Sequence, residues 1–178
     1  MGIQSNNSPE NRETQDRETA QDEFLTQAVE LMFFAYRDFV SDPDTLLSRH
    51  GFGRAHHRVL HFVGRQPGLS IAELLSILAI TKQSLSRVLR ELIDHDYVEQ
   101  RHDEKDGRKR LLFLTDKGRE LQNDLLTPQH IRFAEALEKS DPETLAAWQS
   151  FMFQLINVEN RPALLERLKI KHPKSGGD

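Results

Sequence analysis

The spacing of apolar residues predicts a long helix near the N-terminus. One apolar stripe recurs at intervals of three and four residues, which is the period of an α-helix: Phe24, Ala28, Leu31, Met32, Ala35 and Phe39. A second stripe lies along another side of the same helix: Val29, Phe33, Tyr36 and Val40. A helix that is apolar on two sides needs two partners, because one neighbour covers only one side.

A similar stripe occurs near the C-terminus, formed by Leu145, Trp148, Phe151, Met152 and Leu155. It follows Ser140-Asp141-Pro142-Glu143, which is typical of a helix start. Both helices could simply form the core of a single chain. We favour a second interpretation, in which the two ends of the ordered chain pack around a twofold axis as a homodimer.

Shorter elements are predicted between these helices. The pattern indicates a helix over 54–65, a helix opened by the capping box of Ser70 and Glu73 and ending at Leu78, and a helix over 82–94 capped by Thr81. Two strand-like runs, 97–101 and 110–114, flank a glycine-containing turn and predict a β-hairpin. Thr115 starts a helix to Leu126, and Thr127-Pro128 is expected to kink or interrupt it before another helical stretch through Lys139.

These elements define the expected organisation of the chain. We predict a disordered N-terminal tail (1–21), an N-terminal dimerisation helix (22–50), a winged helix-turn-helix domain (51–119), C-terminal dimerisation helices (120–170) and a flexible tail (171–178). The expected fold class is therefore mainly α with a small β-hairpin wing. No apolar run is long enough to span a bilayer or to act as a secretory signal, so no membrane association and a cytoplasmic location are expected.

Composition narrows the chemistry. The chain has no cysteine, which excludes disulfides, thiolate metal sites and thiol redox switches. The net charge of −4 shows that the whole chain is not a polycation, so any binding to nucleic acid must come from a local patch. The sequence has no phosphate-binding glycine loop, nucleophile elbow or HExxH motif, so we expect neither an enzyme nor a cofactor.

The polar face of the 82–94 helix carries hydrogen-bond donors. Arginine and lysine pair with guanine edges, glutamine pairs with adenine, and hydroxyl groups contact bases or phosphates. The candidate DNA-binding residues of this helix and its cap are Thr81, Lys82, Gln83, Ser84, Ser86, Arg87 and Arg90. The alternative for this face alone is an ordinary solvated helix surface.

The predicted hairpin concentrates positive charge. Residues 101–119 contain seven Lys or Arg and four acids, in a chain whose net charge is −4. Such a hairpin can follow a phosphate backbone or insert arginine into a narrow minor groove, which adds Lys105, Arg108, Lys109 and Arg110 to the candidate DNA contacts. Asp103 and Asp106 would repel phosphate, so we expect them to cap the turn or orient a neighbouring arginine.

These residues together resemble the MarR family of dimeric bacterial transcription regulators. The resemblance rests on the stretch from Leu69 to Gly118, with Asp103-x-x-Asp106-x-Arg108 followed by an apolar strand and Leu114-Thr115-x-x-Gly118. With the flanking helices it covers roughly residues 22–160. Lys105 departs from the pattern, because many members carry arginine there.

The resemblance implies a mostly helical dimer whose two winged lobes bind a pseudo-palindromic operator in double-stranded DNA. Lys82, Gln83, Ser84, Ser86 and Arg87 would face the major groove, and Asp106 would support Arg108 as the wing arginine. It also implies a repressor released by a small phenolic, lipophilic or anionic effector bound between the dimerisation helices and the DNA-binding lobe. Candidate residues for that crevice are Phe33, Phe34, Tyr36, Arg37, His57 and His61, which suit an aromatic acid.

Two alternatives remain at this point. The winged helix could be a protein-interaction module without DNA readout. His57 and His61, four residues apart on one predicted helix, could instead take part in a metal-responsive regulator, although residues 51–65 contain no acid to complete a ligand set. We expect no metal site.

Overall fold

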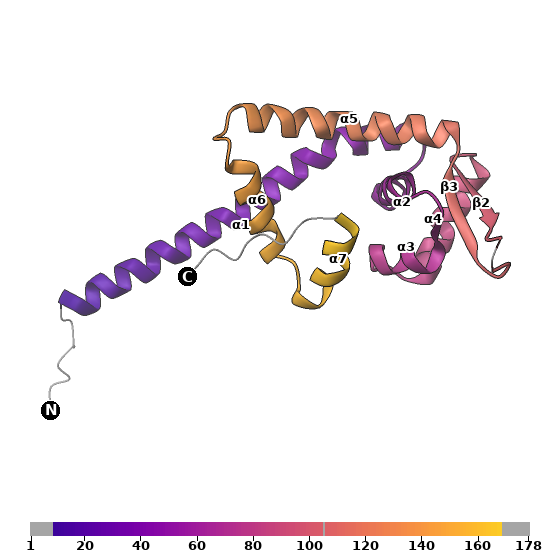
Figure 1. The fold of residues 1–178 in the computed structure, drawn as a ribbon. Coiled ribbons are helices and arrows are strands. Elements are labelled where there is room, and N and C mark those ends of the chain that lie inside the picture. The colour runs from indigo at the N-terminus through magenta and orange to yellow at the C-terminus, as the bar shows by residue number, and fades with distance from the viewer. Residues whose placement is uncertain (1–8, 105, 169–178) are drawn as a thin grey trace. The chain divides into compact units, whose positions relative to one another are not determined.

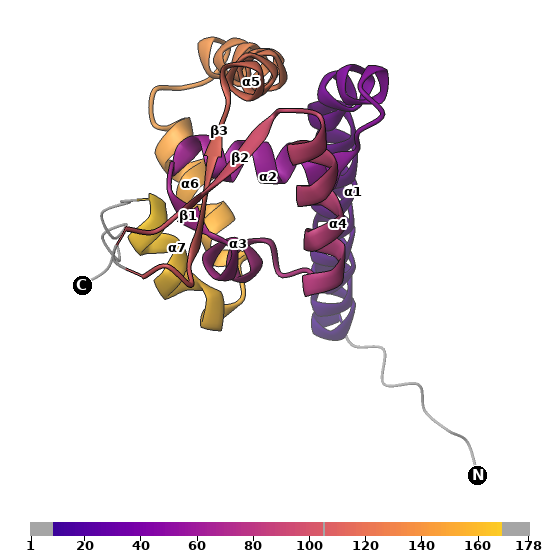
Figure 2. The same cartoon turned by 90° about the vertical axis from the view of Figure 1, so that its right-hand side faces the viewer.

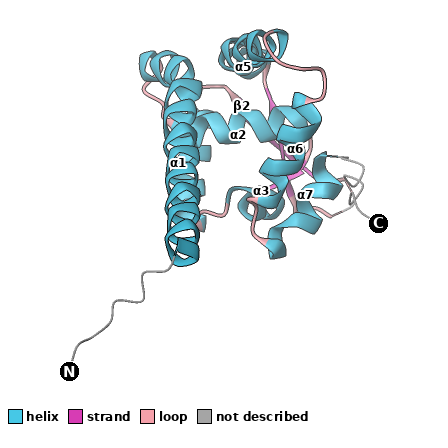
Figure 3. Ribbon diagram, turned by 90° about the vertical axis from the view of Figure 1, so that its left-hand side faces the viewer, coloured by secondary structure: helices cyan, strands magenta, loops and turns pink. Residues whose placement is uncertain are grey.

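The computed structural model describes residues 9–104 and 106–168. The chain forms two compact units, residues 1–129 and 130–178. Helices make up most of the described chain, and its strands belong to one small sheet (Figure 3). Among the described residues, no helix is long and apolar enough to cross a membrane.

The first unit opens with α1 (Pro9–Arg49), a helix of 41 residues. From residue 12 to Arg37 its side chains are exposed except for that of Ala28, which is partly buried. Only the last turns enter the core, through Val40 and Leu47. The apolar stripes of this helix are therefore largely uncovered within a single chain.

One expectation for α1 is corrected. Residues 1–21 were expected to be disordered, but the helix begins at Pro9, and residues 1–8 lie outside the described part. The segment from Pro9 has no apolar stripe, yet proline suits a first helical position, glutamate, glutamine and arginine are good helix formers, and Thr19 bonds back to the carbonyl of Gln15. The helix also continues through Pro43 to Arg49.

The remaining helices of this unit form a lobe with the sheet (Figures 1 and 2). They are α2 (Arg54–Arg65), α3 (Ile71–Leu78) and α4 (Lys82–Asp94), as the sequence predicts. The capping box of Ser70 and Glu73 forms, with the Ser70 hydroxyl accepting from the Glu73 N–H at 3.2 Å. Their apolar faces meet in a core that contains Val59, Leu60, Leu74, Leu85 and Leu92, among others.

The sheet has three antiparallel strands in the order β1-β3-β2. The predicted hairpin corresponds to β2 (Val98–His102) and β3 (Arg110–Leu114), in a register that pairs Val98 with Leu114 and His102 with Arg110. The sequence did not predict β1 (Leu69–Ser70), which pairs with β3. Two residues are too few to produce a recognisable alternation of apolar and polar positions.

The helix after the hairpin corrects a second expectation. Helix α5 (Asp116–Glu138) runs through Thr127 and Pro128 without interruption. Proline removes one backbone hydrogen-bond donor from the helix. The helix tolerates this missing bond because it is long and is buried on both sides of Pro128, at Leu121, Leu125 and Gln129.

The second unit contains the end of α5, α6 (Thr144–Gln154), a 3₁₀ turn η1 (Val158–Asn160) and α7 (Arg161–Leu168). Phe133 and Trp148 pack edge to face, with ring centroids 5.2 Å apart. The predicted C-terminal stripe lies on α6 and just beyond it, where Leu145, Trp148, Phe151 and Leu155 are exposed. The expected tail at 171–178 lies outside the described residues.

Candidate nucleic-acid interface

Helix α4 begins at a well-formed cap. The Thr81 hydroxyl accepts a hydrogen bond from the Ser84 N–H at 3.1 Å and donates to the Ser84 hydroxyl at 2.9 Å. The first N–H groups of an α-helix, here those of Lys82 and Gln83, have no acceptor within the helix, and such groups attract anions. Thr81 and Ser84 therefore have a structural role in addition to the DNA contact expected from the sequence.

The polar face of α4 lines an open hollow of about 840 Å³. The described residues that line it are the six α4 residues predicted as DNA contacts: Lys82, Gln83, Ser84, Ser86, Arg87 and Arg90. All six are exposed, whereas Leu85, Val88, Leu89 and Leu92 on the opposite face are buried. The apolar face thus anchors the helix in the core, and the polar face presents hydrogen-bond donors, with no acid among the described residues that line the hollow.

The hairpin turn is closed by Asp106. Its carboxylate Oδ1 accepts from the Arg108 N–H at 3.1 Å, and its carbonyl accepts from the Lys109 N–H at 2.8 Å. The Asp103 N–H donates to the Lys109 carbonyl at 3.1 Å, which closes the loop at its base. Arg108, Lys109 and Arg110 are exposed, and Lys105 lies outside the described residues.

His102 connects the two arms of the hairpin, which the sequence analysis missed. Its Nδ1 donates to the Gly107 carbonyl at 3.1 Å, because a carbonyl oxygen only accepts. The Nε2 atom then accepts from Nη1 of Arg110 at 2.7 Å. The neutral imidazole thereby holds the Arg110 guanidinium at the base of the turn. Only the register of the hairpin, which places His102 opposite Arg110, reveals this contact.

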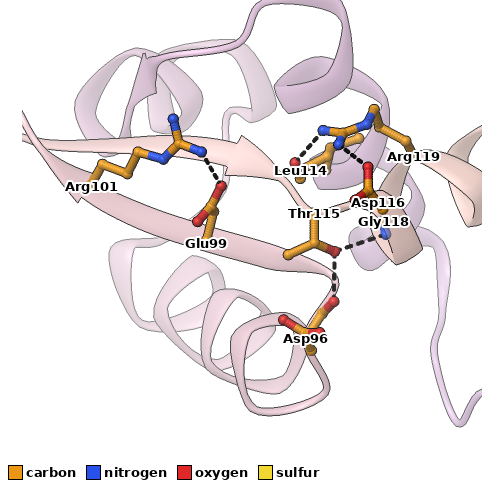
Figure 4. A network of polar contacts seen from close by, with 8 residues as sticks. All are labelled: Asp96, Glu99, Arg101, Leu114, Thr115, Asp116, Gly118 and Arg119. Carbon is orange, nitrogen blue, oxygen red and sulfur yellow. Dashed lines mark hydrogen bonds and ion pairs between the residues drawn. The ribbon is translucent and has the colours of Figure 1, made fainter.

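A compact polar network joins the hairpin to α5 (Figure 4). The Thr115 hydroxyl donates to the Asp96 carbonyl at 2.7 Å and accepts from the Gly118 N–H at 3.0 Å. Arg119 donates to the Leu114 carbonyl at 2.7 Å and pairs with Asp116. These bonds fix the end of β3 against the first turn of α5.

The residues predicted to line an effector crevice lie on α1 and α2. Phe33, Phe34 and Tyr36 are exposed, and the Arg37 guanidinium lies 5.1 Å from the Phe34 ring centroid while bonding to Asp38 at 2.8 Å. His57 and His61 are partly buried on α2. Within the described residues, no group of three or more His, Asp or Glu side chains could hold a metal ion.

His57 makes stability depend on pH. Burial, and secondarily His61, lower its pKa from the ordinary value of 6.5, and Asp44 opposes this shift. The unfolded chain therefore binds a proton at higher pH than the folded chain, so stability is lost as the pH falls through 6.5 towards the folded pKa. We expect His57→Gln to reduce the drop in unfolding free energy between about pH 7 and about pH 5, as measured by urea denaturation. An equal drop in both proteins would contradict this assignment.

Comparison with known proteins identifies the family. The family profile described as the MarR family matches residues 50–109, from the end of α1 through the hairpin turn. The HTH-type transcriptional regulator PetP of Rhodobacter capsulatus is 47% identical over 140 residues, which is 79% of this chain and 84% of PetP.

Solved structures share the fold. A crystal structure of a MarR family transcription regulator superposes with a TM-score of 0.65 at 21% identity, covering 77% of this chain and 91% of that one. The structure of Streptococcus pneumoniae FabT in complex with DNA gives a TM-score of 0.59 at 17% identity, covering 85% and 99%. The chain thus has the fold of these proteins, and the identity to PetP establishes that it belongs to the MarR family of helix-turn-helix transcription regulators.

Proposed function

We propose that the protein is a dimeric repressor of a pseudo-palindromic operator, with α4 of each copy in a major groove and each hairpin against the adjacent phosphates. The observation that carries this proposal is the hollow on α4, lined by three cationic and three hydrogen-bonding side chains. Those side-chain types match the donor and acceptor pattern of base edges in the major groove. The hairpin adds Arg108 and Lys109 as exposed cations for the backbone.

A second copy of the chain is the proposed occupant of the exposed apolar surface. On α1, Phe24 and Leu31 are 68% and 69% exposed. In the second unit, Trp148 and Phe151 are 42% and 58% exposed. Apolar patches on this scale mark association surfaces in soluble proteins, and a twofold dimer matches a two-fold symmetric operator.

The proposed regulation is release from DNA by a small molecule. The aromatic side chains of Phe33, Phe34 and Tyr36 and the cation of Arg37 suit an aromatic acid, with His57 and His61 as further candidates. Such an effector acts by binding more tightly to a dimer whose lobes are wrongly spaced for the operator. Asp38 already pairs with Arg37, so an effector carboxylate would have to compete for that guanidinium.

A protein-interaction module without DNA readout is the alternative. The α4 hollow argues against it, because the centre of a protein-binding surface is usually more apolar and less charged. The two functions differ in their response to salt. Neutralising several phosphates releases counterions and gives a steep dependence of affinity on salt concentration.

A fluorescence-anisotropy titration tests the proposed function. We expect full-length protein to bind a fragment of its own upstream DNA at least about a thousandfold more tightly than a scrambled fragment, with an affinity that falls steeply between two salt concentrations. Weak binding without preference for any sequence, both with this fragment and with a pool of genomic DNA fragments, would overturn the proposal.

Arg108→Ala extends the same titration to the hairpin. Without this guanidinium, binding to native and scrambled DNA should weaken alike, and the slope of log affinity against log salt should fall by about one for each phosphate that is no longer neutralised. Arg17→Ala, which removes an exposed arginine from α1, is the matched control and should leave the slope unchanged. An unchanged slope in Arg108→Ala would remove the hairpin from the interface.

A further inference from the structure

His56 is a buried polar residue for which the proposed function has no role. It lies on the first turn of α2 and is 8% exposed. Its ring stacks on Phe52 with centroids 4.6 Å apart and an interplanar angle of 13°. Its position in the core of the lobe makes its two hydrogen bonds well defined.

The two bonds of His56 determine which nitrogen carries the proton. The Gly53 N–H donates to Nδ1 at 3.1 Å, so Nδ1 must be the unprotonated nitrogen in the neutral ring. Nε2 therefore carries the hydrogen and donates to Oε2 of Glu91 on α4 at 2.6 Å. His56 thus holds one carboxylate oxygen of Glu91, a residue of the helix that carries the proposed DNA contacts.

The other oxygen of Glu91 faces Arg87, one turn earlier on α4. Arg87 Nε lies 4.0 Å from Oε1, at the outer limit of an ion pair, and the Arg87 side chain remains 77% exposed. Residues four apart on a helix are neighbours, and a free glutamate in this position can close onto the arginine. In this structure the carboxylate is instead pulled towards the buried imidazole.

We propose that His56 is a positioning residue for DNA recognition, because it holds Glu91 back and so leaves the Arg87 guanidinium available in the α4 hollow. This inference rests on the proposed function of α4, and it explains how the Arg87 guanidinium is kept available for DNA. Without the Nε2 donor, the Glu91 carboxylate turns to Arg87 and competes with DNA for it. Glu91 itself is 41% exposed and has room to make that movement.

The test combines loss of His56 with removal of the charge on Glu91. His56→Phe keeps a flat ring against Phe52 and removes both hydrogen bonds. We expect it to bind the native fragment about three- to tenfold more weakly, since a surface ion pair formed in each half of the dimer has to be broken. His56→Phe with Glu91→Gln should recover the affinity of Glu91→Gln alone, because a neutral amide does not hold arginine.

A folding defect gives a different result. If His56 only stabilises the lobe, the Glu91 substitution will not restore binding, and that outcome overturns the proposal. His56→Asn is the second variant, because its amide oxygen still offers an acceptor to the Gly53 N–H while its side chain is too short to hold Glu91.

A measurement without DNA separates this inference from the proposed function. In the ¹H–¹⁵N spectrum, the Arg87 Nε–H should exchange with water more slowly in His56→Phe than in the natural protein, and the difference should vanish when Glu91→Gln is added. No change in that exchange rate overturns the proposal, whatever the DNA titration gives. If the natural protein does not discriminate its own DNA, the proposed function fails while the exchange measurement still decides the role of His56.

Discussion

The double substitution Phe24→Glu with Leu31→Glu is expected to convert the protein to monomers and to lower operator affinity at least about a hundredfold. Both side chains are about two-thirds exposed in the single chain, so glutamate there leaves the lobe core intact. In a dimer the same carboxylates would face an apolar partner surface and each other across the twofold axis. Burying an unpaired carboxylate in the dimer interface is costly, so the dimer dissociates. In the monomer, the two DNA-binding lobes are no longer linked, and each binds its half of the operator separately.

Sedimentation velocity and the anisotropy titration measure the two effects. Gln21→Glu places the same charge on an exposed site one turn earlier on α1 and is the matched control. It should leave both the dimer and the affinity unchanged. A double variant that still sediments as a dimer would show that the exposed face of α1 is not the association surface.

Gly118→Ala is expected to lower the free energy of unfolding by about 3 kcal/mol, the upper part of the range for overpacking a core. A Cβ at Gly118 would lie 2.0 Å from the Tyr97 carbonyl oxygen, well inside contact distance. The obstacle is backbone, and Tyr97 is itself tied by its carbonyl to the Thr115 N–H at 3.2 Å. The clash can be relieved only by moving α5 away from the start of the hairpin.

Gly64→Ala is the informative comparison, measured by the same urea denaturation. A Cβ at Gly64 would lie 2.1 Å from the side-chain amide of Gln122. This approach is as close as the one at Gly118, but the neighbouring atom belongs to a flexible side chain. Gln122 can rotate away, and alanine favours helix over glycine, so we expect a change within about 1 kcal/mol. Equal losses in the two variants would mean that the rigidity of the neighbour does not decide the cost.

Much of the lobe was predictable from sequence because its signals are local. The caps at Ser70 and Thr81, the apolar face of the 82–94 helix and the glycine turn of the hairpin each lie within a few residues, and each element forms as predicted. The family, the mainly α winged fold and a non-enzymatic regulator are confirmed by the comparisons. Helical spacing also placed the candidate DNA contacts of α4 on one face, and these residues line the hollow.

The misses have a common physical origin in contacts between residues that are distant in sequence. β1 exists because Leu69 pairs with Leu112, and the His56–Glu91 bond spans 35 residues. Neither pairing leaves a local pattern. Pro128 was expected to kink or interrupt its helix because a local rule penalises proline, whereas the surrounding helix and burial outweigh one missing hydrogen bond.

The junction between hairpin and α5 also determines where the lobe is stiff. One residue, Thr115, separates β3 from α5, and its hydroxyl is bonded on both sides. A joint this short, with its hydroxyl bonded on both sides, restricts rotation between the hairpin and the first turn of α5. The joint between α1 and α2 is longer, and it too is held: Phe52 is buried against His56, and its N–H donates to the Leu47 carbonyl at 3.0 Å. A displacement of the first turn of α5 would therefore pass to the hairpin through one residue.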